Sequence, residues 1–349
     1  MMEKRRHRGL VILALALSTA IATGCGSSSG SQGSSGTSGG QVAIRMQLSW
    51  TPEAEFAGYL VAKAKGYYSQ AGLNVTILPG GPNVNDIQQL VTGAADVTVD
   101  RTSTLFQAWA KGIPIKAIAE TDAEPQIWLV ARKSSGITKP SDLKGKRIGI
   151  YSDDAFIVDT MLKNMGISLN EAKVFFQGFN VNGFIANKYP VSEVYLTSDL
   201  VSILEAGIKE NQLTIFKPAN YGAGIIHGVL IATDKIIQSH PAALTKFVQA
   251  TLKGWEYAYA HPYQAISIVL AAAGSSGGTR AYQTTGLAEM KNIQWPNGTK
   301  PTNWGTIPLS IYEQNAKVVE ASSTSSGGTG GKPINVADTM DTSITSGKG

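Results

Sequence analysis

The pattern of apolar and polar residues from 42 to 77 predicts a strand, a helix and a second strand, and the chain goes on to repeat this order. Apolar side chains occupy every second position from Val42 to Leu48, which predicts a strand with one buried face. Thr51 and Pro52 predict the start of a helix, because a hydroxyl can cap a helix and proline suits its first position. The next strand is predicted from Leu73 to Ile77.

Strands and helices go on alternating as far as residue 233, which predicts an α/β fold with mainly parallel strands flanked by helices. After residue 233 the apolar positions are spaced as in helices, with breaks at Pro262 and at the Gly/Ser run 274–278. The further strands are predicted at 97–99, 113–119, 127–131, 147–151, 174–176, 194–196, 213–216 and 225–233.

Aromatic and polar side chains gather where these strands end, and open α/β sheets bind ligands at the carboxyl ends of their strands. Aromatic rings can stack on a flat ligand, and a few polar groups would fix its orientation. The candidate ligand-binding residues on this argument are Trp50, Phe56, Tyr59, Asp100, Arg101, Asp154, Asn180, Tyr195, Thr197, Asp199 and Tyr221.

Several of these residues also have ordinary structural explanations. Phe56 lies on an amphipathic helix and is equally consistent with a core position. Arg101 beside Asp100 is consistent with a local ion pair worth ~0–1 kcal/mol. Asp154 could cap the following helix, and the strand of Tyr195 does not reveal which face that side chain takes. The histidines are too scattered in the sequence to predict a metal or catalytic site.

The first forty residues differ in kind from the rest. A basic segment at Lys4–Arg8 and an apolar run at Leu10–Leu17 precede Ala22-Thr23-Gly24, which predicts a signal peptide over residues 1–24. The apolar run is much shorter than the ~20 residues that span a bilayer. Cys25 follows, as in a bacterial lipobox, and is the chain's single cysteine, so we expect a lipidated Cys25 on a flexible Gly/Ser tether over 25–40.

Removal of the signal peptide would change the charge of the protein. It takes away four cations and one carboxylate, which lowers the formal net charge from +5 to +2. The chain has no dense basic patch interleaved with aromatic residues, so we do not expect nucleic acid as a partner.

Four segments of the chain resemble one known family. They are the block from Trp50 through FAGY to GYYSQAGLNVTI, the segment Gly93–Val99, the segment Asp142–Gly149 and the segment Phe247–Pro262. The chain is similar here to substrate-binding lipoproteins of ABC importers for thiamine-pyrimidine precursors, riboflavin, nitrate, sulfonates and taurine. The resemblance covers most of residues 42 to about 319.

The resemblance implies a two-lobe type II periplasmic-binding-protein fold with a two-strand hinge, near 127–133 and 225–233. The first lobe would comprise 41–133 and 234–342, the second 134–233 including the return crossover, and 343–349 would be a flexible tail. The implied function is capture of a small molecule outside the cell by a membrane-anchored monomer that delivers it to permease and ATPase subunits. No cofactor, metal or catalytic residue is implied.

The resemblance leaves the ligand open. Relatives that bind pyrimidine precursors often carry asparagine and histidine where this chain has Glu55 and Phe56, so Glu55 joins the candidate site and a more apolar, flavin-like wall is indicated. Arg101, Ser103 and Thr104 keep nitrate, sulfonate or taurine as an alternative. A pyrimidine synthase of thiamine biosynthesis resembles the same opening block, but it would need a cysteine-rich motif that this chain lacks.

Overall fold

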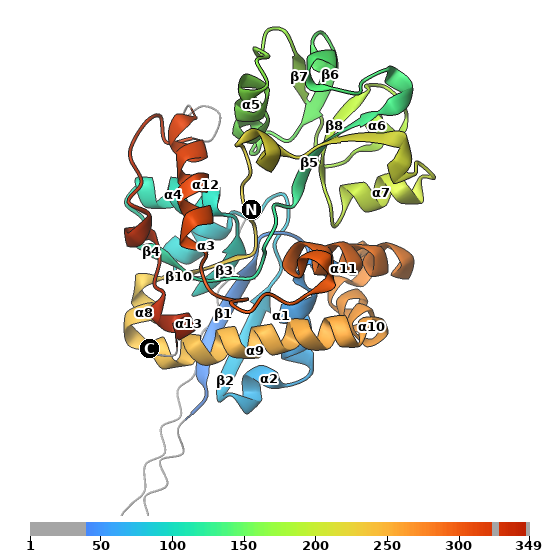
Figure 1. Ribbon diagram of the computed structural model, residues 1–349. Helices are drawn as coiled ribbons and strands as arrows, with labels where there is room; N and C mark the ends of the chain where they lie inside the picture. Colours follow the sequence, from blue (N-terminus) through green and yellow to red (C-terminus); the bar gives the residue numbers. More distant parts are fainter. Residues whose placement is uncertain (1–39, 323–327, 347–349) are drawn as a thin grey trace, which may run out of the picture. The chain divides into compact units, whose positions relative to one another are not determined.

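The computed structural model describes residues 40–322 and 328–346, and its strands form two sheets of five (Figure 1). The first sheet has the order β2-β1-β3-β10-β4 and the second β7-β6-β8-β5-β9. The strands of the first sheet are β1 (Val42–Leu48), β2 (Leu73–Leu78), β3 (Val97–Asp100), β4 (Ile115–Glu120) and β10 (Val229–Thr233). The strands of the second are β5 (Ile127–Arg132), β6 (Arg147–Ile150), β7 (Lys173–Phe176), β8 (Val191–Tyr195) and β9 (Leu213–Phe216).

Four strands of each sheet run in one direction and the fifth runs against them. In the first sheet β1 pairs in parallel with β2 and β3, while β10 is antiparallel to β3 and β4. In the second, β6 is parallel to β7 and β8, while β5 is antiparallel to β8 and β9. The prediction of mainly parallel strands therefore holds, with one reversed strand in each sheet.

The helices lie between and after these strands. Those of the N-terminal part are α1 (Ala57–Ala64), α2 (Tyr67–Gln70), α3 (Asp86–Val91) and α4 (Thr102–Ala110). Those connecting the second sheet are α5 (Ala155–Asn164), α6 (Asn182–Ile185) and α7 (Asp199–Glu205). The C-terminal helices are α8 (Asp234–Ser239), α9 (Pro241–Ala260), α10 (Pro262–Ala273), α11 (Arg280–Gln294), α12 (Leu309–Ala321) and α13 (Ser343–Ser346).

The C-terminal helices return to the first sheet, as the yellow-to-red ribbons beside the blue and cyan strands show (Figure 1). The closest packing joins α1 to α9 at two glycines. A Cβ on Gly254 would collide with the carbonyl oxygen of Gly58, and a Cβ on Gly58 would collide with the ring of Trp255. Glycine at both positions lets the two helices approach closely, and it places Trp255 in the core with none of its surface exposed.

The two segments that cross between the sheets lie one strand away from their predicted places. Strand β5, which the resemblance placed in the first lobe, pairs within the second sheet, and β10, which it placed in the second lobe, pairs within the first. The crossings are therefore the segments 121–126 and 222–228, and the last strand begins at Val229 rather than at Ile225. They touch where Thr121 N and Oγ1 donate to the carbonyl of Gly228, at 3.2 and 3.1 Å.

Two predicted element ends also differ from the structure. The first helix begins at Ala54 with a single 3-10 turn, not at Thr51, because the side chain of Gln283 accepts the Ala54 amide at 2.7 Å and fixes the turn there. The tail predicted to be flexible forms α13, whose Ile344 is buried and accepts from Thr245 Oγ1 at 3.0 Å. The predicted signal peptide, Cys25 and most of the predicted tether lie outside the described residues. Within the described ranges, no helix has the length and apolar character needed to cross a membrane.

Candidate functional site

A cavity of about 960 Å³ opens where strand ends of both sheets meet. Ser49 follows β1 and Asp100 ends β3 in the first sheet, while Tyr151 follows β6 and Tyr195 ends β8 in the second. All four line the cavity, so strand ends that are far apart in sequence contribute to one cleft. This is the place that the sheet topology favours for a ligand.

The structure brings together eight of the twelve predicted ligand-binding residues in this cleft. They are Trp50, Glu55, Asp100, Arg101, Asp154, Asn180, Tyr195 and Asp199. Phe56 and Tyr59 line a smaller inner pocket beside it. Thr197 and Tyr221 line neither: Thr197 is buried beneath α11, where its carbonyl faces Gly286, and Tyr221 lies on a 3-10 turn that packs on α5.

Arg101 connects the two lobes across the cleft. Its Nη1 donates to Asp154 Oδ1 at 2.5 Å and to the Tyr195 hydroxyl at 2.7 Å, and its Nη2 donates to Asp153 Oδ2 at 3.0 Å. The Tyr195 hydroxyl donates in turn to Asp154 Oδ2 at 2.7 Å. Arg101 precedes α4 at the end of β3, whereas Asp153 and Asp154 follow β6 and Tyr195 ends β8, so this group forms a latch between the lobes.

The latch answers two questions that the sequence left open. Asp154 precedes α5 but its side chain caps no helix amide, and it is fully buried against Arg101 instead. The Nε of Arg101 lies 3.8 Å from Asp100 Oδ1, whereas the shorter contacts of the guanidinium reach across the cleft. We refer to Arg101, Asp154 and Tyr195 as the latch below.

Aromatic rings meet across the cleft as well. The ring of Trp50, after β1, lies 5.6 Å from the ring of Phe179, after β7, at an angle of 39°. Phe179 is 60% exposed, although it is a large apolar residue. An exposed ring packed against a half-buried indole offers an aromatic surface on which a flat ligand could stack.

Carboxylates dominate the polar lining of the cleft. Seven acidic side chains face two cations, Arg101 and Lys111. The acidic residues are Glu53, Glu55, Asp86, Asp100, Asp153, Asp154 and Asp199.

Burial makes several of these carboxyl groups hold their protons. Desolvation, reinforced by the charge of Asp86, raises the pKa of Asp100 to about 8. Desolvation and the charge of Asp122 raise the pKa of Glu55 to about 8. Burial also raises the pKa of Asp154 and of Asp199 to about 6, although the Arg101 guanidinium lowers the first of these. Such groups can accept hydrogen bonds as carboxylates or donate them as acids.

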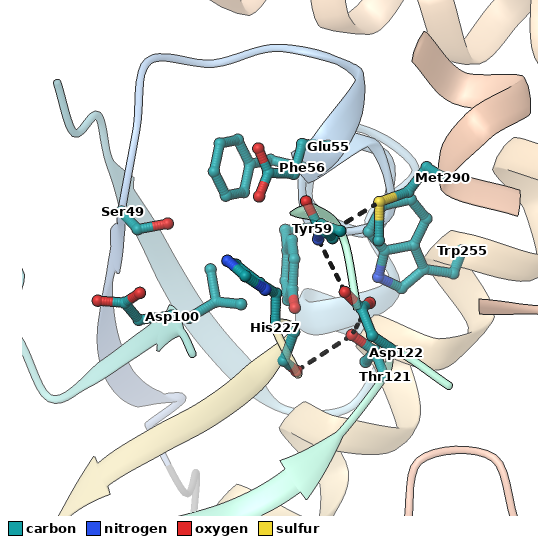
Figure 2. A pocket seen from close by; sticks show the side chains of 13 residues that line it. Ser49, Glu55, Phe56, Tyr59, Asp100, Thr121, Asp122, His227, Trp255 and Met290 are labelled. Atoms are coloured by element: carbon teal, nitrogen blue, oxygen red, sulfur yellow. Dashed lines mark hydrogen bonds between the residues drawn. The ribbon is translucent and has the colours of Figure 1, made fainter. Parts of the chain in front are cut away.

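The inner pocket adjoins the cleft and has a volume of about 20 Å³ (Figure 2). It shares Ser49, Glu55, Asp100 and His227 with the cleft, and Tyr59 and Trp255 form further parts of its wall. His227 lies in the crossing segment before β10, and its ring meets that of Tyr195 edge-on at 5.6 Å. Burial lowers the pKa of His227 to about 3, so its imidazole is neutral.

Sequence analysis did not single out Glu53, Ser49 or His227 for the site. Tyr151 follows a strand like the predicted residues, and its hydroxyl donates to Asp199 Oδ2 at 2.7 Å. The signal for Tyr151 was therefore present in the sequence. His227 carried no such signal, because its place depends on which segment crosses between the sheets.

The residues of the site can bind and orient a molecule. Among the described residues, no group of three or more His, Cys, Asp or Glu side chains is arranged to hold a metal ion. The cleft offers ring faces, many acceptors and few cations. This combination suits a flat molecule that donates hydrogen bonds.

Comparisons with known proteins agree with this geometry. A sequence model of the family described as NMT1/THI5 like matches residues 53–265. The riboflavin-binding protein RibY of Chloroflexus aurantiacus is 27% identical over 235 residues, which make up 65% of each chain. The match thus spans slightly less than two thirds of that relative. The 4-amino-5-hydroxymethyl-2-methylpyrimidine phosphate synthase of Candida albicans is 29% identical over 235 residues, 64% of this chain and 69% of the synthase.

Solved structures show the same fold at much lower identity. The periplasmic sulfonate-binding protein SsuA of Methylobacillus flagellatus KT, assigned to a sulfonate ABC transporter, superposes with a TM-score of 0.65. The superposition covers 88% of this chain and 94% of SsuA, at 12% identity. The predicted periplasmic-binding-protein fold is thereby confirmed, and the likeness carries no information on the ligand.

Proposed function

Because the chain belongs to the NMT1/THI5-like family, we propose that it is an extracytoplasmic solute-binding protein of an ABC importer. It captures a small aromatic heterocycle, riboflavin-like or thiamine-pyrimidine-like, between its two lobes and delivers it to a permease. Ligand contacts with both lobes favour the closed arrangement, which the permease then distinguishes from the open one.

One observation carries this proposal: the cleft combines an exposed pair of aromatic rings with a lining of acidic side chains. Trp50 and Phe179 provide stacking surfaces, and Asp100, Glu55 and Asp199 provide acceptors for N–H or O–H groups. Stacking contributes ~0.5–1.5 kcal/mol beyond the buried area. Neutral hydrogen bonds contribute ~0.5–1.5 kcal/mol each, and those to an ionised carboxylate contribute ~1.5–3 kcal/mol.

The same lining disfavours nitrate, sulfonate or taurine as the ligand. An anion would meet seven acidic side chains, and the cation best placed to receive it, Arg101, is already bonded to Asp153 and Asp154. Lys111 is the other cation of the cleft, and its side chain is exposed. The acidic side chains that are ionised repel an anion, and one exposed lysine offsets little of this repulsion.

Because some relatives are synthases, the alternative to a transport function is an enzymatic one. The resemblance requires a cysteine-rich motif for that activity, and this chain has one cysteine, Cys25, within the predicted lipobox. Binding proteins occur among the relatives at the same level of identity as the synthases. We therefore propose transport without chemistry.

We also propose that Cys25 carries a lipid anchor on the outer face of the cell membrane and that the protein acts as a monomer. Acyl chains add ~0.8 kcal/mol per buried methylene, so two or three chains hold the protein firmly. A Cys25→Ser variant should move from the membrane fraction to the soluble extracytoplasmic fraction. Retention of that variant on the membrane would contradict the anchor.

A thermal-shift screen of the purified full chain tests the ligand class. The panel comprises riboflavin, 4-amino-5-hydroxymethyl-2-methylpyrimidine, taurine, an alkanesulfonate and nitrate. A true ligand at about 100 times its Kd stabilises the folded state by ~2.7 kcal/mol, which is readily measured. We expect a shift with a heterocycle, and a shift confined to the anions would overturn the proposal.

A further inference from the structure

Two lysines and two tyrosines interleave on the surface where α2 packs on α9. Lys65 Nζ lies 4.7 Å from the ring centre of Tyr257, and Lys253 Nζ lies 4.2 Å from the ring centre of Tyr67. The two tyrosine rings meet edge-on, with their centroids 6.4 Å apart. Both lysines are exposed, and both tyrosines are half-buried. We refer to Lys65, Tyr67, Lys253 and Tyr257 as the lysine–tyrosine face.

The positive charge of this face is not offset by nearby carboxylates. Neither of its lysines forms a salt bridge with any described residue. Residues 56–85 include no acidic side chain, and α9 has one, Glu256, which is already bonded to Lys300 at 2.7 Å. Lys246 lies two turns before Lys253 on α9 and is exposed as well. The face therefore attracts an anionic surface.

The lysine–tyrosine face lies at the end of the first lobe where the predicted tether enters. Gln41 Nε2 donates to the carbonyl of Ser69 in α2 at 3.4 Å, and the Val42 amide donates to the Gly72 carbonyl at 3.1 Å. Figure 1 shows α2 at the end of the first sheet where β1 begins. Fifteen residues separate Cys25 from Gln41, and Gly/Ser-rich chains of that length span roughly 20 Å on average. An anchor at Cys25 thus keeps the face within reach of the membrane.

We propose that the lysine–tyrosine face contacts the anionic headgroups of the membrane in which Cys25 is anchored. This inference rests on the anchor in the proposed function. Lysine side chains extend their ammonium groups toward lipid phosphates, and tyrosine rings suit the boundary between headgroups and acyl chains, because they have an apolar body and a polar tip. Each lysine held near an anionic membrane strengthens the contact by about fivefold.

This contact would orient the anchored protein for capture of its ligand. The cleft lies at the carboxyl ends of the strands, whereas the lysine–tyrosine face lies beside the amino end of β1. The seven residues of β1 correspond to a length of about 23 Å. A chain held by this face therefore keeps its cleft away from the lipid and open to solutes. Two or three lysines bind reversibly, so the chain can leave the surface to meet a permease.

Acetylation of lysines on the anchored protein tests the inference without any substitution. The lipidated protein is reconstituted in vesicles of phosphatidylcholine, alone or mixed with phosphatidylglycerol, and the modification of each lysine is followed by mass spectrometry. We expect Lys65 and Lys253 to react about threefold more slowly, or slower still, on the vesicles with phosphatidylglycerol. Lys188 and Lys209 are exposed on the second lobe and should react at the same rate on both kinds of vesicle.

Two outcomes of the acetylation experiment would overturn the inference. Equal rates for Lys65 and Lys253 on both kinds of vesicle would show that their contacts with the tyrosines serve only to pack α2 on α9. Protection that appears only after a permease is added to the vesicles would assign the face to a protein partner.

A pair of double variants provides the matched comparison. Lys65→Gln/Lys253→Gln and Lys188→Gln/Lys209→Gln each remove two exposed cations, but only the first pair belongs to the face. We expect the first to lower the partitioning of the unlipidated full chain onto phosphatidylglycerol vesicles by about tenfold or more, and the second to change it by less than about twofold. Added salt should remove the difference, because it screens exposed charges. Equal losses in both variants would overturn the inference.

The outcomes also separate this inference from the proposed function. A thermal shift with a heterocycle, together with lysine reactivity that does not depend on the lipid, refutes the inference alone. Recovery of Cys25 without acyl chains refutes the proposed anchor and this inference with it.

Discussion

Replacing Arg101 with glutamine should weaken ligand binding by loosening the closed arrangement of the lobes. Arg101 is 13% exposed and Asp154 is fully buried, at 2.5 Å from each other, and they belong to opposite lobes. Their contact exists when the lobes are together, so its loss destabilises the closed state and does not change the stability of either lobe by itself. The pair with Asp153 contributes little, because Asp153 is 58% exposed.

The size of the effect depends on the interactions that Asp154 retains without Arg101. Truncating one partner of a buried ion pair costs ~3–5 kcal/mol when the remaining charge stays unpaired. Asp154 retains the Tyr195 hydroxyl at 2.7 Å, and burial already raises its pKa to about 6, so without Arg101 it can protonate. A net loss of ~2 kcal/mol remains, which lowers the closed fraction and raises the apparent Kd by about 30-fold.

Calorimetric titration of the ligand from the thermal-shift screen measures this change. Lys111→Gln is the control, because it removes the same charge from the same cleft and Lys111 forms no salt bridge with any described residue. The double variant Arg101→Gln/Asp154→Asn should show a coupling energy of ~1.5 kcal/mol or more. Additive single effects, or an equal loss of affinity in Lys111→Gln, would refute the latch.

Three further results are expected. Trp50→Ala should weaken binding of the heterocycle by about tenfold through loss of stacking while thermal unfolding without ligand stays the same, and an unchanged Kd would remove Trp50 from the site. Burial raises the pKa of Asp100 to about 8, so the folded chain holds a proton that the unfolded chain releases near pH ~4. The folding stability that is present below pH ~4 is therefore lost as the pH rises toward about 8. Asp100→Asn should flatten this decline in denaturant titrations. Gly254→Ala should cost ~1–3 kcal/mol or more in unfolding free energy because its Cβ meets the Gly58 carbonyl, whereas Gly40→Ala, with open space around it, should change nothing.

The order of strands and helices could be predicted from the sequence because each element carries its own local pattern. Residues at strand ends followed from that order: Asp100, Arg101, Asp154 and Tyr195 all lie in the cleft as expected. Thr197 did not, because it comes two residues after the end of β8 and turns beneath α11. Strand-end position therefore locates the cleft, while the path of the following loop decides which side chains reach it.

Long-range pairing is what the sequence could not reveal. Nothing in the apolar run of β10 shows that it pairs with β3 and β4 rather than within the second sheet. The role of His227 depends on that pairing, since it precedes β10 and is buried where the two crossing segments touch. The latch also required two lobes in contact, and no local spacing links Arg101 to a residue 53 positions later.

The most direct test of the proposed function is the Kd of the purified full chain for 4-amino-5-hydroxymethyl-2-methylpyrimidine, measured together with that for taurine under the same conditions. A cleft with seven acidic side chains and two cations should bind the heterocycle with a Kd of ~10 μM or below and leave taurine unbound. Binding of taurine without binding of the heterocycle would contradict the account.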